Sequence, residues 1–235
     1  MHIRLAVEDI EPDHWIAWAL DLPACYSSAR TMVDAITHAP KKIAEYYSWI
    51  SKHDNTYPVV DEPFEVQIVE TFQSRASRED PEYLVNAFFE DDRRSLGYWE
   101  VEIALQLLDW TRQDLLDVLH LISAEQLTKT IPGEACGSIA GILNHVAGAE
   151  NWYFGQLGLG KGDLPVEPLE KIEAVRCNTR EQLVKLVGDE RVLQNCDELW
   201  SGRKIVRRTL WHERDHTQHI QQLLSHDVQP VEGAK

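Results

Sequence analysis

Three histidines within ten residues form the strongest chemical signal in this chain. The stretch "WHERDHTQHI", Trp211 to Ile220, places His212 and His216 four residues apart, with His219 three residues further on. On an α-helix, side chains four residues apart share one face about one turn apart, so both imidazoles could reach a single cation. Catalytic zinc-type sites use three protein ligands and keep a further position open. A third ligand is therefore expected from another segment.

The segment "IAGILNHVAGAENWYFGQL" supplies the candidate third ligand, His145. Ile142, His145, Ala149 and Trp152 follow one another at helical spacings of three, four and three. We expect this stripe to face a core, where an imidazole needs a partner for each ring nitrogen. His145 is thus a metal ligand or a hydrogen-bonded core residue. Trp152 on the same stripe is either the wall of a pocket or plain core packing.

A rival motif overlaps the same histidines. Residues His212 to His216 satisfy H-E-x-x-H, which in metalloproteases supplies two zinc ligands and, at the position of Glu213, a general base. The extended form of that motif requires a histidine six residues after the second ligand, where this chain has Gln222. We therefore expect Glu213 to lie at the surface or behind the ligands. Beyond the candidate ligands, no pair of nucleophile and base stands out, so catalytic residues are not assigned.

The balance of charges excludes several classes of partner. The chain has 235 residues, with 39 Asp and Glu against 23 Lys and Arg, a formal net charge of -16. Nucleic-acid backbones and anionic membrane surfaces both require clusters of basic residues. The N-terminal "MHIRLAVEDIEPDHW" carries charges where a secretory signal needs an apolar core. The four cysteines show no CxxC spacing, which favours reduced thiols and a cytoplasmic location.

Two parts of the chain with different periodicity must position these residues. Residues 2–8, 14–28 and 64–72 predict strands, and an apolar pattern with helical spacing starts after Thr31. We expect a small α+β domain over 1–72 and a polar linker over 73–95.

The segment "WIAWALDLPACYSSARTMVDAITHAPKKIAEYYSWI" resembles the HicB-like family, with its strand, D-L-P-x-C turn, strand and helix. Ala24 and Ala29 stand where glycines are usual in that family. Its members are often antitoxins with a separate DNA-binding tail. No ribbon-helix-helix or helix-turn-helix pattern follows here, so repression is not carried over. We expect this domain to be a small accessory sheet.

Helical periodicity dominates the rest of the chain. In the run "LGYWEVEIALQLLDWTRQDLLDVLHLIS" the expected apolar stripe consists of Leu96, Trp99, Ile103, Leu107 and Trp110. Ser123 to Gln126 and Thr179 to Gln182 read as capping boxes at helix starts, and Ser138 as a further N-cap. The last helix is expected from about Arg203 to His226. Four helices with a long crossover predict a four-helix bundle over 96–228, which makes the chain an α+β two-domain protein.

The stretch from Thr111 to Leu224 resembles the DinB-like family of metal-binding four-helix bundles. The segment "TRQDLLDVLHLISAEQLTKTIPGEACGSIAGILNHVAGAENWYFGQLG" follows the first two helices of that family, and "HERDHTQHI" follows its last-helix H-x-x-x-H. The resemblance implies that His145, His212 and His216 are the metal ligands. Many members have Gln where this chain has His219. His219 is thus a pocket group, a fourth ligand or a solvated residue on the helix surface.

Three imidazoles and an open position suit zinc or nickel best, with iron or copper as further candidates. A bound ion of this kind lowers the pKa of water or binds a thiolate. The resemblance implies a metal-dependent hydrolase or a transferase that uses a low-molecular-weight thiol, acting on a small molecule, and leaves a homodimer open. The alternative is a non-catalytic bundle that binds a metal or a partner protein.

Overall fold

The computed structural model describes residues 2–60 and 63–227, and the chain divides into two compact units. The first unit comprises Met1–Gly97 and Gly188–Arg207, and the second comprises Tyr98–Val187 and Arg208–Lys235. A mixed sheet near the N-terminus is followed by helices, which confirms the α+β class. The last helix, α6 (Gly202–Asp227), begins in the first unit and continues in the second.

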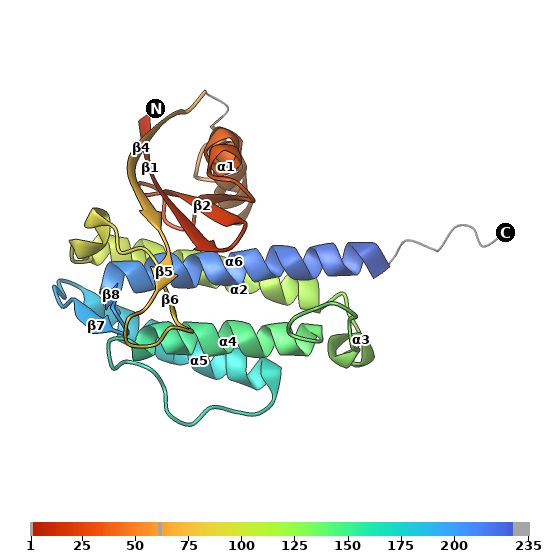
Figure 1. Ribbon diagram of the computed structural model, residues 1–235. Coiled ribbons are helices and arrows are strands. Elements are labelled where there is room, and N and C mark those ends of the chain that lie inside the picture. Colours follow the sequence, from red (N-terminus) through yellow and green to blue (C-terminus); the bar gives the residue numbers. More distant parts are fainter. Residues whose placement is uncertain (1, 61–62, 228–235) are drawn as a thin grey trace. The chain divides into compact units, whose positions relative to one another are not determined.

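A four-stranded sheet forms the core of the first unit (Figure 1). Its strands are β1 (His2–Glu11), β2 (His14–Ala19), β3 (Tyr26–Ala29) and β4 (Glu65–Gln73), in the order β3-β2-β1-β4. The β1–β2 and β2–β3 pairs are antiparallel, whereas β4 runs parallel to β1. These are the strands that the alternating patterns predict.

Helix α1 (Met32–His53) covers one face of this sheet (Figure 1). Thr31 caps it, because its hydroxyl accepts a hydrogen bond from the amide of Asp34 at 3.1 Å. The helix buries residues spaced three or four apart, as an amphipathic helix does. They are Ala35, Ala39, Ile43, Tyr46 and Ile50.

Residues 73–95 are not a linker, in contrast to the sequence-based expectation. They form β5 (Arg75–Ala76), β6 (Leu84–Val85) and the short 3-10 helix η1 (Glu90–Arg93). The fully buried carboxylate of Glu8 in β1 accepts hydrogen bonds from Trp18 and from the amide of Ala87, both at 2.8 Å. A buried carboxylate requires such partners, so the segment is part of the first unit.

The first unit also takes up residues 188–207, which the sequence assigns to the helical domain. Strands β7 (Leu193–Asn195) and β8 (Glu198–Trp200) form a hairpin ahead of α6. Lys204 in α6 and Glu198 are both fully buried and pair at 2.6 Å. Arg207 pairs with Glu8 at 3.2 Å and with Asp92 at 2.7 Å. The first turns of α6 therefore belong to the first unit. The sequence did not predict this, because helical periodicity does not show at which residue a continuous helix passes from one unit to the other.

The second unit is helical. Its elements are α2 (Tyr98–Leu119), α3 (Ala124–Thr128), α4 (Ile139–Gly155), α5 (Pro168–Leu183), η2 (Val184–Leu186) and the rest of α6. Figure 1 shows α4 and α5 side by side. One hydrophobic core draws on α2, α4, α5 and α6, with Leu115, Ile142, Val175 and Ile220 all at 2% exposure or less.

Two details of the helices differ from the sequence-based expectation. Trp99 and Ile103 are 75% and 43% exposed, because α2 turns Val101, Ala104, Leu108 and Leu115 inward instead. The second concerns the predicted capping box at Thr179, which lies inside α5 and is buried. Helix α5 begins at Pro168, whose fixed φ and missing amide hydrogen suit the first helical position.

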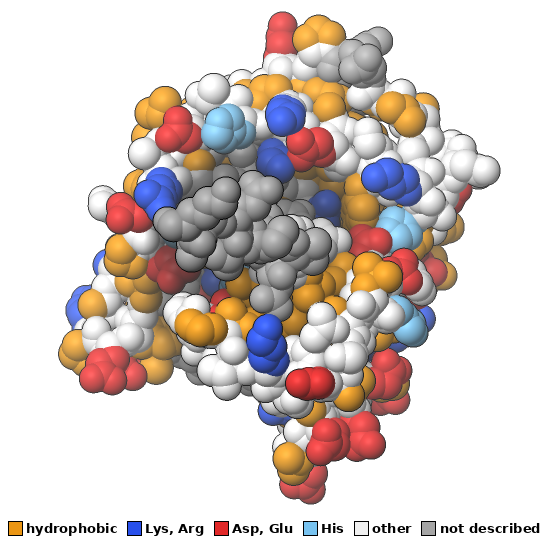
Figure 2. Space-filling model, turned by 90° about the vertical axis from the view of Figure 1, so that its right-hand side faces the viewer, with side chains coloured by type: hydrophobic (Ala, Val, Ile, Leu, Met, Phe, Trp, Pro, Cys, Tyr) orange, Lys and Arg blue, Asp and Glu red, His pale blue; other side chains and the backbone are white. Residues whose placement is uncertain are grey.

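Neither unit offers a helix suited to spanning a bilayer: among the described residues, none is both long and apolar enough. On the face drawn in Figure 2, acidic, basic and hydrophobic side chains are interspersed.

Candidate metal centre

The second unit brings together the imidazoles of His145, His212 and His216. One nitrogen from each ring lies within 4.8 Å of the corresponding nitrogens of the other two. The Nε2 atoms of His145 and His212 are 3.1 Å apart. The ring centroids of His212 and His216 are 4.5 Å apart, in agreement with a spacing of one helical turn. The sequence-based prediction of this cluster is confirmed.

Helices α4 and α6 position the three rings. Ser138 caps α4 by accepting a hydrogen bond from the amide of Gly141 at 3.1 Å, which fixes the start of the helix that carries His145. His145 itself is exposed, His212 is buried and His216 is intermediate. The expectation that His145 faces the core is therefore wrong: α4 buries Ile142 and Val146 and leaves His145 at the edge of the core.

The arrangement fits a divalent ion. Ligand nitrogens at about 2.0–2.1 Å from a tetrahedral zinc ion are about 3.3 Å from one another, close to the Nε2–Nε2 distance of 3.1 Å. The Nδ1 atom of His216 is buried and has no hydrogen-bond partner, and a bound cation would satisfy it. Imidazole nitrogens suit zinc, nickel, copper and iron alike, so the donor set leaves the identity of the metal open.

The environment keeps two of the rings neutral, which is the form that binds a metal. Burial, followed by the proximity of His216, His145 and Arg208, holds the pKa of His212 well below its usual range. Burial, together with His145 and His219, lowers the pKa of His216 to about 4. Near neutral pH both imidazoles therefore have a lone pair available, and protons compete only weakly with an ion.

A cavity of about 400 Å³ opens beside the cluster. His145 and His212 line it together with Trp152, Tyr153 and Arg208. Trp152 is 42% exposed, so it is a wall of the cavity and not a member of the core. The ion site thus faces a space large enough for a small molecule.

Glu213 takes no part in the cavity. Its carboxylate is buried, and Thr111, Arg112 and Arg176 donate to it at 2.9, 2.8 and 2.8 Å. Burial alone would raise the pKa of Glu213, but Arg176 and Arg112 outweigh this effect and lower it. Of the two positions expected for Glu213, the surface one is therefore wrong, whereas a buried position behind the histidines agrees with the structure. Because both oxygens are held by these donors, the carboxylate is not placed to act as the general base of a metalloprotease.

Arg176 completes this buried network by pairing with Glu150 at 3.0 Å. Burial opposes the charge of Arg176, but Glu150 and Glu213 raise its pKa. Since Glu150 is on α4, Arg176 on α5 and Glu213 on α6, the network ties both ligand-bearing helices to α5.

His219 stands apart from the three-histidine group. Its Nε2 lies 3.1 Å from a carboxylate oxygen of Glu134, and its ring centroid is 6.1 Å from that of His216. The ring is thus engaged with a carboxylate, which argues against His219 as a fourth ligand.

Several residues of the site escaped the sequence-based reasoning. Arg208 precedes His212 by four residues, so the spacing already places both on one helix face. The buried stripe Ile172, Val175, Arg176 and Thr179 on α5 likewise signals a charge inside the second unit. Tyr153 gave no comparable signal.

Comparison with protein-family models, with curated proteins and with solved structures finds no match for this chain. The function is therefore inferred from the side chains of the site.

Proposed function

We propose that the chain is a divalent-metal-dependent enzyme that acts on a small molecule, built on a DinB-like four-helix bundle. The observation that carries the proposal is the three-histidine cluster at the edge of a cavity of about 400 Å³. A lone imidazole in a core needs a hydrogen bond, whereas three imidazoles whose nitrogens converge within 4.8 Å offer three lone pairs to one cation.

The bundle is supported by the shared core of α2, α4, α5 and α6. Metal sites in four-helix bundles are built from side chains on facing helices that point inward. His145 on α4 and His212 and His216 on α6 likewise come from two helices of the unit, although His145 lies exposed at the edge of the core. The resemblance to DinB-like proteins assigns the same three positions, and zinc or nickel is the preferred ion.

An open coordination position favours catalysis over a purely structural role. The neighbouring groups that could close the site are engaged elsewhere, Glu213 with two arginines and His219 with Glu134. Structural zinc sites have four protein ligands, whereas catalytic sites have three. An ion with a free position supplies a Lewis acid that lowers the pKa of water or binds a thiolate. A hydrolase and a thiol-dependent transferase both fit this chemistry.

The residues of the chain contribute binding and orientation. Trp152 and Tyr153 form an aromatic wall beside His145 and His212. Arg208 places a fixed positive charge in the same wall. The network around Glu213 restrains the rotation of α6, on which His212 faces the cavity.

Cobalt substitution tests whether the site is open. The visible spectrum of the cobalt-loaded protein reports the number of ligands, and 2-mercaptoethanol should add a thiolate-to-metal absorption band if a position is free. The same titration of cobalt in buffer without protein is the control. Acetate is added in a parallel titration. If neither 2-mercaptoethanol nor acetate changes the spectrum of the cobalt-loaded protein, the site is closed and the non-catalytic alternative holds.

A further inference from the structure

Arg208 is a buried cation beside the candidate ion site. It lies one helical turn before His212 on α6 and is 7% exposed. Its guanidinium carbon lies 4.9 Å from the ring centroid of Trp211 and 5.8 Å from that of Tyr153. A guanidinium stays protonated at any physiological pH, so this charge is permanent. Both rings thus lie within cation–π distance of its planar guanidinium group.

The cavity beside Arg208 has a positive character that contrasts with the protein as a whole. The residues that line it are His145, Gly148, Ala149, Trp152, Tyr153, Arg208 and His212. No Asp or Glu is among these described lining residues, although the chain carries a formal net charge of -16. A low-dielectric hollow with one sign of charge concentrates ligands of the opposite sign. A bound divalent ion would add to this effect.

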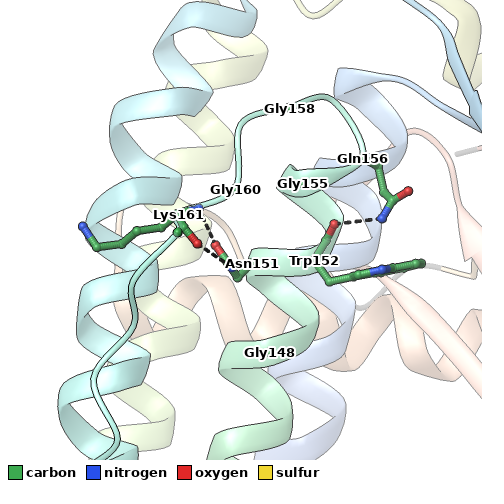
Figure 3. A pocket seen from close by; sticks show the side chains of 9 residues that line it. Gly148, Asn151, Trp152, Gly155, Gln156, Gly158, Gly160 and Lys161 are labelled. Carbon is green, nitrogen blue, oxygen red and sulfur yellow. Dashed lines mark hydrogen bonds between the residues drawn. The ribbon is translucent and has the colours of Figure 1, made fainter.

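A second cavity of about 510 Å³ adjoins the first and shares Gly148 and Trp152 with it. Figure 3 shows the loop that carries Gly158, Gly160 and Lys161 beside the end of α4, with Trp152 turned away from Asn151. Asn151 holds the loop in place, because it accepts from the amide of Lys161 at 2.7 Å and donates to the carbonyl of Lys161 at 3.0 Å. The glycines leave a space without side chains on the far side of Trp152.

We propose that the substrate is an organic carboxylate whose carboxylate pairs with Arg208 next to the ion, and whose body extends along Trp152 towards the glycine-lined cavity. The inference rests on the proposed function, since it names the substrate class of that same site. A guanidinium group can pair with a planar carboxylate through two parallel N–H···O bonds, and the experiment below compares this carboxylate with a phosphate. The aromatic wall favours an apolar or aromatic body.

Binding of benzoate and of its neutral counterpart benzamide to the metal-loaded protein tests the anion part. We expect benzoate to bind the wild type tightly relative to benzamide, and Arg208→Gln to weaken benzoate binding by about ten- to hundredfold. Arg208→Lys keeps the positive charge but loses the planar guanidinium group. Its affinity for benzoate should lie between those of the wild type and of Arg208→Gln. Arg214→Gln, on the same helix but outside the lining of the cavity, is the matched control. Phenyl phosphate provides the comparison with a phosphate.

Equal binding of benzoate and benzamide by the wild type overturns the inference without the need for any variant. Benzoate binding that is unchanged in folded Arg208→Gln also overturns it, because the ion alone would then hold the carboxylate. Phenyl phosphate bound far more tightly than benzoate overturns the assignment to a carboxylate.

Two glycines of α4 test where the body of the substrate lies. A Cβ atom added at Gly148 or at Gly155 meets no other atom within 4 Å, so the first atom of a side chain is accommodated at both positions. Gly148 lines both cavities, whereas Gly155 lines only the glycine-lined one. We expect Gly148→Leu to weaken both benzoate and 4-phenylbenzoate, and Gly155→Leu to weaken only the longer 4-phenylbenzoate. Unchanged binding in both variants contradicts the proposed path.

Metal content is measured on every sample, which separates this inference from the proposed function. Metal-loaded protein that does not distinguish benzoate from benzamide refutes the role of Arg208 and leaves the metal site intact. Protein that binds no metal but still selects benzoate through Arg208 refutes the metal enzyme and supports the anion site.

Discussion

The Nε2 atoms of His145 and His212 lie 3.1 Å apart, although 67 residues separate the two histidines along the chain. At this distance one nitrogen donates a proton to the other, or a cation lies between them. His216 adds a third ring on the same side, with its centroid 4.9 Å from that of His145. Three imidazoles that converge are more readily explained by an ion than by a single shared proton.

Removal of His145 should abolish tight metal binding. We expect His145→Ala to weaken the affinity for zinc at least a hundredfold, because two ligands four residues apart seldom hold an ion alone. His120→Ala, which removes an exposed histidine of the same unit, should leave the affinity unchanged. Competition with a chromogenic chelator measures the zinc affinity of both variants. Equal affinity of the two variants would show that His145 is not a ligand.

Neutralisation of Glu213 should lower the free energy of unfolding, because we expect this residue to stabilise the fold and not to act as a catalytic base. Glu213→Gln leaves Arg112 and Arg176 with only Glu150 as a buried counter-charge, so we expect a loss of roughly 3 kcal/mol in the free energy of unfolding. Glu125→Gln on exposed α3 should change it by less than about 0.5 kcal/mol. Urea denaturation provides the values. A stable Glu213→Gln protein that only loses hydrolytic activity would instead revive the metalloprotease hypothesis.

The metal-free protein should lose stability as the pH falls from 6.5 towards 4. In the folded state the pKa of His216 is about 4 against an ordinary value of 6.5, so within this window the unfolded chain binds more protons than the folded one. Stability is thus complete above the unfolded pKa and declines below it, by roughly 1–3 kcal/mol. Urea denaturation after treatment with a chelator follows the decline, and His216→Asn should show a shallower slope. If the free energy of unfolding depends on pH identically in both proteins, His216 is not a buried neutral imidazole in the folded state.

Arg207 should stabilise the first unit even though it lies on the last helix. Arg207→Met leaves the buried carboxylates of Glu8 and Asp92 without their cation, which costs about 3–5 kcal/mol. Hydrogen exchange of the amides of β1 and β2 should accelerate accordingly. Arg30→Met, at an exposed position of the same unit, is the control. Unchanged protection of β1 would mean that the start of α6 is not part of this unit.

The sequence predicted the first sheet, the main helices and the three clustered histidines because these depend largely on local spacing. The alternation in β1 and β2 and the four-residue interval between His212 and His216 can be read without knowledge of distant neighbours. The position of His145 opposite them followed from the pairing of two helices. The exposure of the His145 side chain could not be predicted in this way, because the other helices determine which face of α4 packs inward.

Charged residues inside the protein account for most of the errors. The sequence left Glu213 either at the surface or behind the histidines, and it is Arg112 and Arg176 from two other helices that make its burial favourable. Segment 73–95 reads as a linker because it is polar, yet Asp92 and the amide of Ala87 find partners in the first unit. Such pairings join residues that are far apart in the chain, so local sequence patterns do not predict them.

X-ray absorption at the metal edge of untagged, stoichiometrically loaded protein tests the three-histidine site most directly. We expect one ion per chain with three imidazole nitrogens at about 2.0–2.1 Å and one further light-atom ligand from solvent or buffer. The signature of imidazole scattering should fall to two rings in any His145→Ala protein that still retains metal. A shell without imidazoles, or one unchanged by the loss of His145, would contradict the assignment.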